Sequence, residues 1–567
     1  MTTNPSDDTG LVIPSLLLSS LAAVVLLIAS LNMANMMLVR GTARRKEIAL
    51  RLALGAGRKS ILLQLFTEGL LLSLLGGAAG LGAAYWSTTV LMRSLAPLAP
   101  IDMVFSGGPD LRVLAATMGF SLLSTLLFGL GPAWNLSRAD ILSGIKAGEY
   151  QSPAGAKRRL FSRGNLLVMG QVALSLMLLT VAGLFIRSAI ASAHIDPGFR
   201  IENELVAEVD PSLAGYDETH GRQLYRTLLD RLRGVPGVES ASVAATVPFG
   251  MISLGRDVQR STDPVATPSN PASRAGVVSC RYNIVSEDYF KTLGIPLLQG
   301  RSFLPGEIGN KTSAVVVVDN VTATRLWPKG GAIGRHIRLL GGDGQQAAQD
   351  VEVVGLVGSI RESVLGEGVG PHVYAPLGQA YQSDMNIHIS LAGQAKGREA
   401  QLLEAVRREI RAVDGRLPVL ALKTLPAHME GSIDIWIVRT AARMFTIFGG
   451  VALLLAMVGL YGVRAYTVAR RTREIGIRMA LGASAGAVQQ TVLREGLAVT
   501  AIGAGAGLVL ALGLGKILAS MLYHVSGADP LVFLAAPAVL VAVSLLACYF
   551  PARRASQVDP MVALRMD

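Results

Sequence analysis

Residues 46–56 read KEIALRLALGA, and residues 473–483 read REIGIRMALGA. Each copy follows one long apolar run and precedes another. The same short charged helix is therefore predicted twice, each time between two hydrophobic segments. Two equivalent elements on one chain indicate a membrane protein that meets a partner with two-fold symmetry.

The repeated helix has the same candidate residues in both copies, namely Glu47, Arg51, Leu54 and Gly55 in the first and Glu474, Arg478, Leu481 and Gly482 in the second. An acid four residues before an arginine is a favourable helical pair. The glycine permits the chain to turn into the next helix. An amphipathic helix of this kind could simply anchor in lipid headgroups. Anchoring requires only the right polarity, so the near-identical residues favour docking of another protein.

The composition places the chain among membrane proteins. Apolar residues make up 51% and charged residues 16%, against about 25% charged in an ordinary soluble domain. The net charge of +12 does not indicate nucleic-acid binding, because lysine and arginine gather beside the apolar runs, as the positive-inside rule requires. Two cysteines in different contexts, Cys280 and Cys548, give no sign of a disulfide.

Seven runs have the length of a membrane span: 12–38, 61–86, 113–134, 165–187, 444–466, 487–519 and 531–550. Basic residues fill the loops after the first, third, fifth and seventh runs. These loops are therefore predicted to be cytoplasmic. It follows that the N-terminus is periplasmic, the C-terminus is cytoplasmic, and residues 190–438 lie outside.

The similarity between the two copies extends beyond the charged helix. Glu68 matches Glu495 at the same spacing, and two glycine pairs also match, Gly76 with Gly80 and Gly503 with Gly507. Glycines four residues apart let membrane helices approach closely. They could pack helices within one subunit or form a dimer seam. Each copy is predicted to be a three-helix unit.

Residues 190–438 have the composition of an α+β domain with its own core. Helices are predicted at 224–232 and 398–413, and strands at 239–247, 282–285, 314–318 and 351–357. The seven histidines show no metal-ligand spacing. Residues 55–60 superficially resemble a phosphate loop, but Arg58 interrupts the Gly-Lys-Ser core. No catalytic residue, metal or cofactor is expected on this chain.

The paired motifs and their flanking helices resemble the FtsX-like permease domain. The segment between them resembles the MacB-type periplasmic core domain, in phrases such as 196–199, 293–296, 325–328 and 373–377. Two permease copies on one chain are similar to the duplicated orphan permeases described for acidobacteria. The resemblance implies an α-helical polytopic protein divided into a short external N-terminus at 1–11, a first permease domain at 12–150, a basic linker and fourth span at 151–189, a periplasmic domain at 190–438 and a second permease domain at 439–567.

The resemblance implies a bacterial inner-membrane ABC-type permease that works by mechanotransmission. A dimeric cytoplasmic ATPase would bind ATP and Mg²⁺ and move the two repeated helices as coupling helices, and the other partners would be the lipid bilayer and a periplasmic adaptor or outer-membrane channel. A complete duplicated member would carry a further span and periplasmic domain before residue 11. Alternatives are a non-transporting regulator of a periplasmic enzyme and a truncated, inactive paralogue.

Overall fold

The computed structural model describes residues 8–43, 51, 54, 57–95, 115, 119, 163–192, 196–264, 276–308, 314–340, 348–364, 369–393, 397–519, 522–523 and 525–557. The chain divides into two compact units. One consists of Met1–Ala189 with Arg439–Asp567, and the other of Ile190–Val438.

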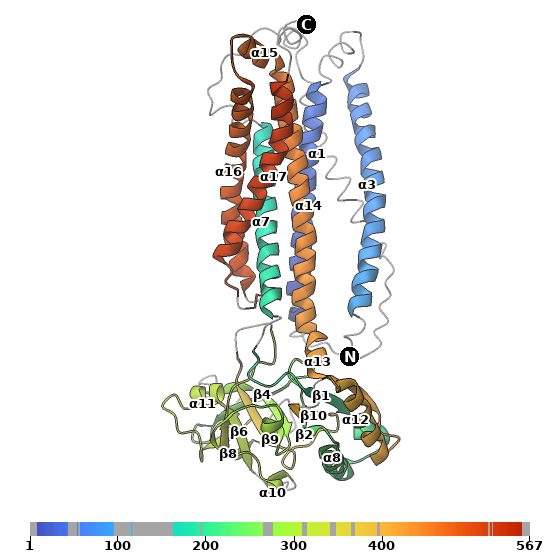
Figure 1. Cartoon of the computed structure of the whole chain (residues 1–567), viewed down its shortest axis with the longest axis vertical. Coiled ribbons are helices and arrows are strands. Elements are labelled where there is room, and N and C mark those ends of the chain that lie inside the picture. Colours follow the sequence, from blue (N-terminus) through green and yellow to red (C-terminus); the bar gives the residue numbers. More distant parts are fainter. Residues whose placement is uncertain are drawn as a thin grey trace. The chain divides into compact units, whose positions relative to one another are not determined.

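The first unit is helical (Figure 1). Its helices are α1 (Asp8–Ala43), α3 (Arg58–Leu95), α7 (Arg163–Ser192), α14 (Ile433–Arg470), α15 (Thr472–Ala480), α16 (Ala485–Ile517) and α17 (Pro530–Ser556). Among the described residues, five helices are long and apolar enough to cross a membrane: α1, α7, α14, α16 and α17. Helix α3 contains the predicted span 61–86, whereas the predicted span 113–134 lies outside the described residues apart from two positions. The number of seven spans therefore stays a prediction.

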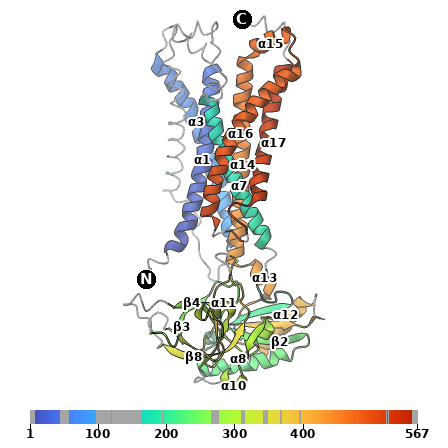
Figure 2. The ribbon, with the colours of Figure 1, turned by 90° about the vertical axis from the view of Figure 1, so that its left-hand side faces the viewer.

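Helix α7 is the centre of this unit, and both views show it among α14, α16 and α17 (Figures 1 and 2). Two thirds of its apolar window is buried, against about one third in each of the other four spans. One core joins Leu176 of α7 to Leu460, Val499 and Leu540 of its three neighbours. The other spans therefore leave most of their apolar surface for lipid, as membrane helices do.

The second unit is an α+β domain. Its strands are β1 (Glu204–Val209), β2 (Val238–Ala244), β3 (Leu254–Arg260), β4 (Val278–Val285), β5 (Leu297–Gly300), β6 (Val315–Asp319), β7 (His336–Leu339), β8 (Gln349–Val357), β9 (His372–Pro376), β10 (Met385–Leu391) and β11 (Val419–Thr424). They form one sheet in the order β11-β1-β10-β2-β4-β3-β7-β8-β6-β9, with β5 on β8 and a further parallel pairing of β4 with β9. The predicted strands at 239–247, 282–285, 314–318 and 351–357 are confirmed as β2, β4, β6 and β8.

In the described part of this unit, seven helical segments accompany the sheet: η2 (Pro211–Ala214), α8 (Glu218–Arg233), α9 (Tyr289–Thr292), α10 (Pro305–Ile308), α11 (Asn320–Leu326), α12 (Glu399–Val413) and α13 (Leu425–Glu430). The predicted helices at 224–232 and 398–413 are confirmed as α8 and α12. Both are amphipathic, since the buried residues of α8 recur at helical spacing. Helix α8 packs on β2, and α12 packs on α8 and β11.

Candidate functional site

The end of α14, helix α15 and the start of α16 together form a compact turn, the α15 corner, defined here as residues 464–495. Helix α15 is the second copy of the repeated motif. Its Ile475 is buried against Val488 of α16, with Val468 and Met479 packed around them. The amphipathic face of the short helix is thus covered by the two long helices beside it.

A Schellman motif ends α15 and turns the chain into α16. The backbone N–H of Gly482 donates to the carbonyl of Met479 at 3.0 Å, and that of Ala483 donates to the carbonyl of Arg478 at 2.9 Å. Gly482 has φ +95°, a conformation that glycine adopts without steric cost. Ser484 then caps α16 by accepting from the N–H of Ala487. The glycine in the motif therefore has a defined geometric role.

The acid and the arginine of the motif form the expected pair. Arg478 donates to Glu474 at 2.5 Å, and both side chains are about half exposed. Leu481, at the outer end of the turn, is 84% exposed. An exposed pair of this type contributes only about 0.3–0.5 kcal/mol to stability. These three side chains are thus accessible to a partner while contributing little to stability.

The first copy is described only in part. Arg51 is helical and exposed, and it donates to Gln64 at 3.1 Å. Leu54 lies in a turn and is 80% exposed, close to the value for Leu481 in the second copy. Glu47 and Gly55 lie outside the described residues. The two described positions therefore share the exposure of their counterparts.

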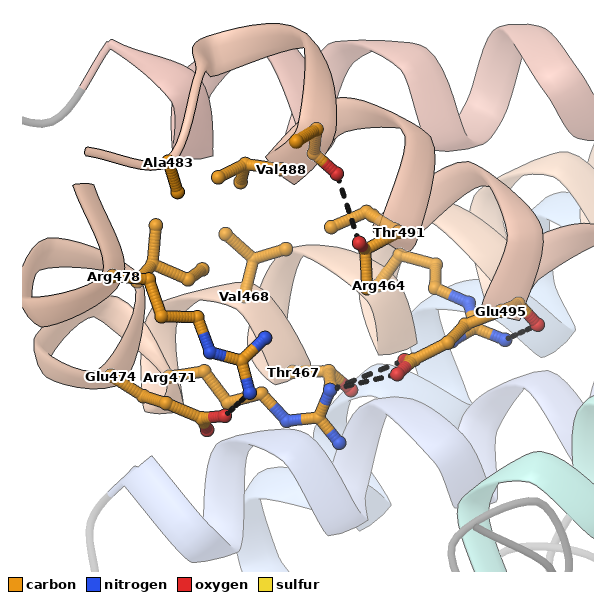
Figure 3. A pocket seen from close by; sticks show the side chains of 13 residues that line it. Arg464, Thr467, Val468, Arg471, Glu474, Arg478, Ala483, Val488, Thr491 and Glu495 are labelled. Atoms are coloured by element: carbon orange, nitrogen blue, oxygen red, sulfur yellow. Dashed lines mark hydrogen bonds and ion pairs between the residues drawn. The ribbon is translucent and has the colours of Figure 1, made fainter. Parts of the chain in front are cut away.

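An ion-pair cluster lies inside the α15 corner (Figure 3). Arg471 donates to both carboxylate oxygens of Glu495, at 3.0 and 3.2 Å. Arg464 donates to the backbone oxygen of Glu495 at 3.0 Å, and its Nη1 lies 3.7 Å from that carboxylate. The cluster ties α14 to α16 on either side of α15. A shift of α15 would be transmitted to both long helices through these contacts.

The sequence reasoning missed this cluster. It counted Arg464 and Arg471 only as positive charges that fix orientation. A signal was available, because a helix continued through both positions, seven residues apart, would place the two arginines on one face; in the structure α14 ends at Arg470 and Arg471 follows it directly. That Glu495 on α16 lies opposite this face could not be read from spacing.

The two glycine pairs have different surroundings. A Cβ at Gly503 would lie 2.8 Å from the backbone oxygen of Met169, and a Cβ at Gly507 would lie 2.6 Å from that of Ala173. These glycines let α16 approach α7 within one chain. At Gly76 and Gly80 of α3, a Cβ would meet no atom of the described residues within 4 Å.

A buried cluster of titratable groups lies in the second unit. His372 is 3.4 Å from Glu362, and Arg281 donates to the same carboxylate at 2.8 Å. Burial alone would raise the pKa of Glu362, but its contacts with His372 and Arg281 hold that pKa below the ordinary value. The same carboxylate raises the pKa of His372 against the effect of burial. Among the described residues no group of three or more candidate ligands could hold a metal ion. The cluster is a set of charged pairs that holds strands and loops together.

Comparison with known proteins identifies the family. The model of the FtsX-like permease C-terminal domain matches two segments, residues 19–141 and 446–560, and that of the MacB-like periplasmic core domain matches residues 166–413. Both copies of the repeated helix lie inside the FtsX-like segments.

Relatives include the macrolide export ATP-binding/permease protein MacB of Shigella boydii serotype 4 (strain Sb227), 27% identical over 304 residues, which cover 51% of this chain and 43% of that protein. MacB 1 of Yersinia pestis bv. Antiqua (strain Antiqua) is 26% identical over 291 residues, which cover 49% of this chain and 42% of that protein. The chain thus spans less than half the length of these relatives.

A solved structure, the periplasmic region of MacB from Actinobacillus actinomycetemcomitans, aligns at 12% identity with a TM-score of 0.27, covering 41% of this chain and 92% of that one. A TM-score this low supports no inference about this chain. The matched domains show that the chain belongs to the FtsX-like permeases with a MacB-like periplasmic core domain, and five of its described helices are long and apolar enough to cross a membrane.

Proposed function

We propose that this permease couples ATP hydrolysis by a separate cytoplasmic ATPase to movement of its periplasmic domain, and so drives export by mechanotransmission. Helix α15 and residues 46–56 are the two coupling helices that a dimeric ATPase moves. The N-terminus is periplasmic and the C-terminus cytoplasmic. The further partners are a periplasmic adaptor or an outer-membrane channel.

The exposure of the repeated motif is the observation that carries this proposal. Glu474 and Arg478 are about half exposed and Leu481 is 84% exposed, although these side chains contribute little to the fold. The two leucines that follow the helix, Leu54 and Leu481, are about equally exposed. A protein-docking surface explains why the two copies share the same polar and apolar residues, whereas anchoring in headgroups would require only the same polarity.

The cluster beneath α15 supports the mechanical part. Glu495 of α16 contacts Arg464 of α14 and also Arg471, which lies between α14 and α15, so a push on α15 reaches two spans at once. The phosphate-binding motif is broken in this sequence. ATP and Mg²⁺ are accordingly bound by the partner, and this chain has no ATPase activity of its own.

Charge reversal at the motif tests the docking. Glu474→Lys should lower the amount of ABC ATPase recovered with the permease from native membranes by about tenfold, because it places like charges across an interface. Asp230→Lys is the matched control, since Asp230 is an exposed acid on α8. The ATPase is identified by mass spectrometry from peptides that contain a phosphate-loop motif.

The double variant Glu474→Lys/Arg478→Glu restores the pair within α15 but inverts its order. If the amount of ATPase recovered with this variant stays low, the partner contacts these two charges directly. If it returns to the wild-type level, the loss caused by Glu474→Lys came from a weakened helix. Equal losses for Glu474→Lys and Asp230→Lys would count against docking at α15.

A further inference from the structure

The α15 corner encloses a cavity of about 260 Å³. Its walls come from the last turns of α14, from α15 and from the first turns of α16 (Figure 3). The predicted spans 444–466 and 487–519 end and begin here, so we infer that the cavity lies near the depth of lipid headgroups, whichever side of the membrane it faces.

The charges that line the cavity do not balance. Three guanidinium groups, those of Arg464, Arg471 and Arg478, line it together with only two carboxylates, Glu474 and Glu495. Arg478 is satisfied by Glu474, and Arg471 is satisfied by both oxygens of Glu495. The third guanidinium group is left to share a carboxylate that is already engaged.

That third group belongs to Arg464, which is only 3% exposed. Its Nη1 is 3.7 Å from Glu495, too far for a hydrogen bond, and its Nε has no partner among the described residues. A buried charge with unused donors is costly unless an opposite charge lies beside it. The cavity is therefore short of one anion.

The rest of the lining is mostly apolar. Val468, Ile475, Val488 and Val492 contribute aliphatic surface, and Thr467 and Thr491 add two hydroxyl groups. An occupant that fits both walls has an anionic head and an apolar stem. Basic pockets between membrane helices at this depth are suited to phosphate-bearing headgroups, and planar guanidinium groups match phosphate oxygens.

We propose that the α15 cavity binds a phosphate anion, supplied either by the headgroup of an anionic phospholipid or by free inorganic phosphate. The apolar wall favours the lipid. A bound phosphate would neutralise the third guanidinium group and brace α15 against α14 and α16. This inference does not depend on ATPase docking, and its test contains no ATPase.

The test measures lipid binding to the purified full-length chain by native mass spectrometry. Phosphatidylglycerol should bind at least about tenfold more tightly at the tightest site than diacylglycerol, which lacks the phosphate, as the loss of a charged hydrogen-bonded pair implies. Arg464→Gln should remove most of that preference, and Arg471→Gln and Arg478→Gln, which change the other two arginines of the cavity, should each weaken it. Arg494→Gln is the matched control, because Arg494 is exposed on α16, next to Glu495, and does not line the cavity.

Inorganic phosphate distinguishes the two sources. If it displaces phosphatidylglycerol, or raises the apparent Tm of the wild type but not of Arg478→Gln, the cavity takes free phosphate as well. Arg471→Lys keeps the charge and should retain part of the preference, which separates anion binding from loss of fold. Equal binding of the two lipids with no effect of phosphate would overturn the proposal, as would wild-type binding by all three glutamine variants.

Discussion

The glycine pairs of α3 and α16 allow close helix packing to be compared at matched positions of the two repeats. Gly507 of α16 and Gly80 of α3 occupy the same place in the repeated motif, four residues after Gly503 and Gly76. Only the second copy has a described helix against its glycines. Alanine at Gly507 should therefore destabilise the helical unit, whereas alanine at Gly80 should not.

The size of the effect follows from the contact distances. A Cβ at position 507 would lie 2.6 Å from the backbone oxygen of Ala173, about 0.9 Å closer than an ordinary contact of about 3.5 Å. Backbone atoms cannot rotate away, so α16 and α7 must separate locally. Overpacking of this kind costs about 1–3 kcal/mol. The gain in helix propensity from glycine to alanine, about 1 kcal/mol, is common to both sites and cancels in the comparison.

The assay is thermal unfolding of the purified chain in detergent, with Gly507→Ala and Gly80→Ala measured side by side. The apparent Tm should be lower for Gly507→Ala, by about 2–4 °C for each kcal/mol of difference. Retained lipid and helical content serve as controls for misfolding. A Tm for Gly507→Ala that rises above the wild-type value, as the gain in helix propensity alone would raise it, would refute the packing of α16 on α7.

Three further predictions follow from other sites. Glu495→Gln removes the carboxylate between two arginines and should cost about 1–3 kcal/mol, which a lower apparent Tm would reveal and an unchanged Tm would contradict. Burial raises the pKa of Glu204 to about 8. Because this carboxyl stays protonated in the folded protein, the folded protein loses stability as the pH rises from about 4.5 to about 8. Glu204→Gln should therefore stabilise the chain more at pH 8 than at pH 5, and a pH-independent effect would contradict this. A cysteine at the exposed Ser60 should react with an impermeant maleimide only after the inner membrane is permeabilised, and labelling in intact spheroplasts would reverse the topology.

Local patterns predicted the elements that depend on local physics. The run 165–187 had to be a helix, because a span of about 20 apolar residues must satisfy its own backbone hydrogen bonds in lipid, and it is α7. Short runs rich in valine predicted buried strands such as β6 and β8. Periodicity likewise predicted α8 and α12.

Contacts between distant segments were beyond such reasoning. The parallel pairing of β4 with β9 places Arg281 beside His372, although 90 residues separate them in the sequence. The glycine pairs show the same limit: Gly76 and Gly503 stand in the same motif, yet only Gly503 has a described helix against it. Arg464 is a further case, since its burial depends on Glu495 and on its packing near Gly496.

Crosslinking from the α15 corner tests directly whether an ABC ATPase docks there. A photoreactive amino acid replaces Leu481, which is 84% exposed, and the full-length chain is irradiated in native membranes. If α15 is a coupling helix, we expect an adduct with an ABC ATPase on the cytoplasmic side. An adduct with periplasmic protein instead would contradict it.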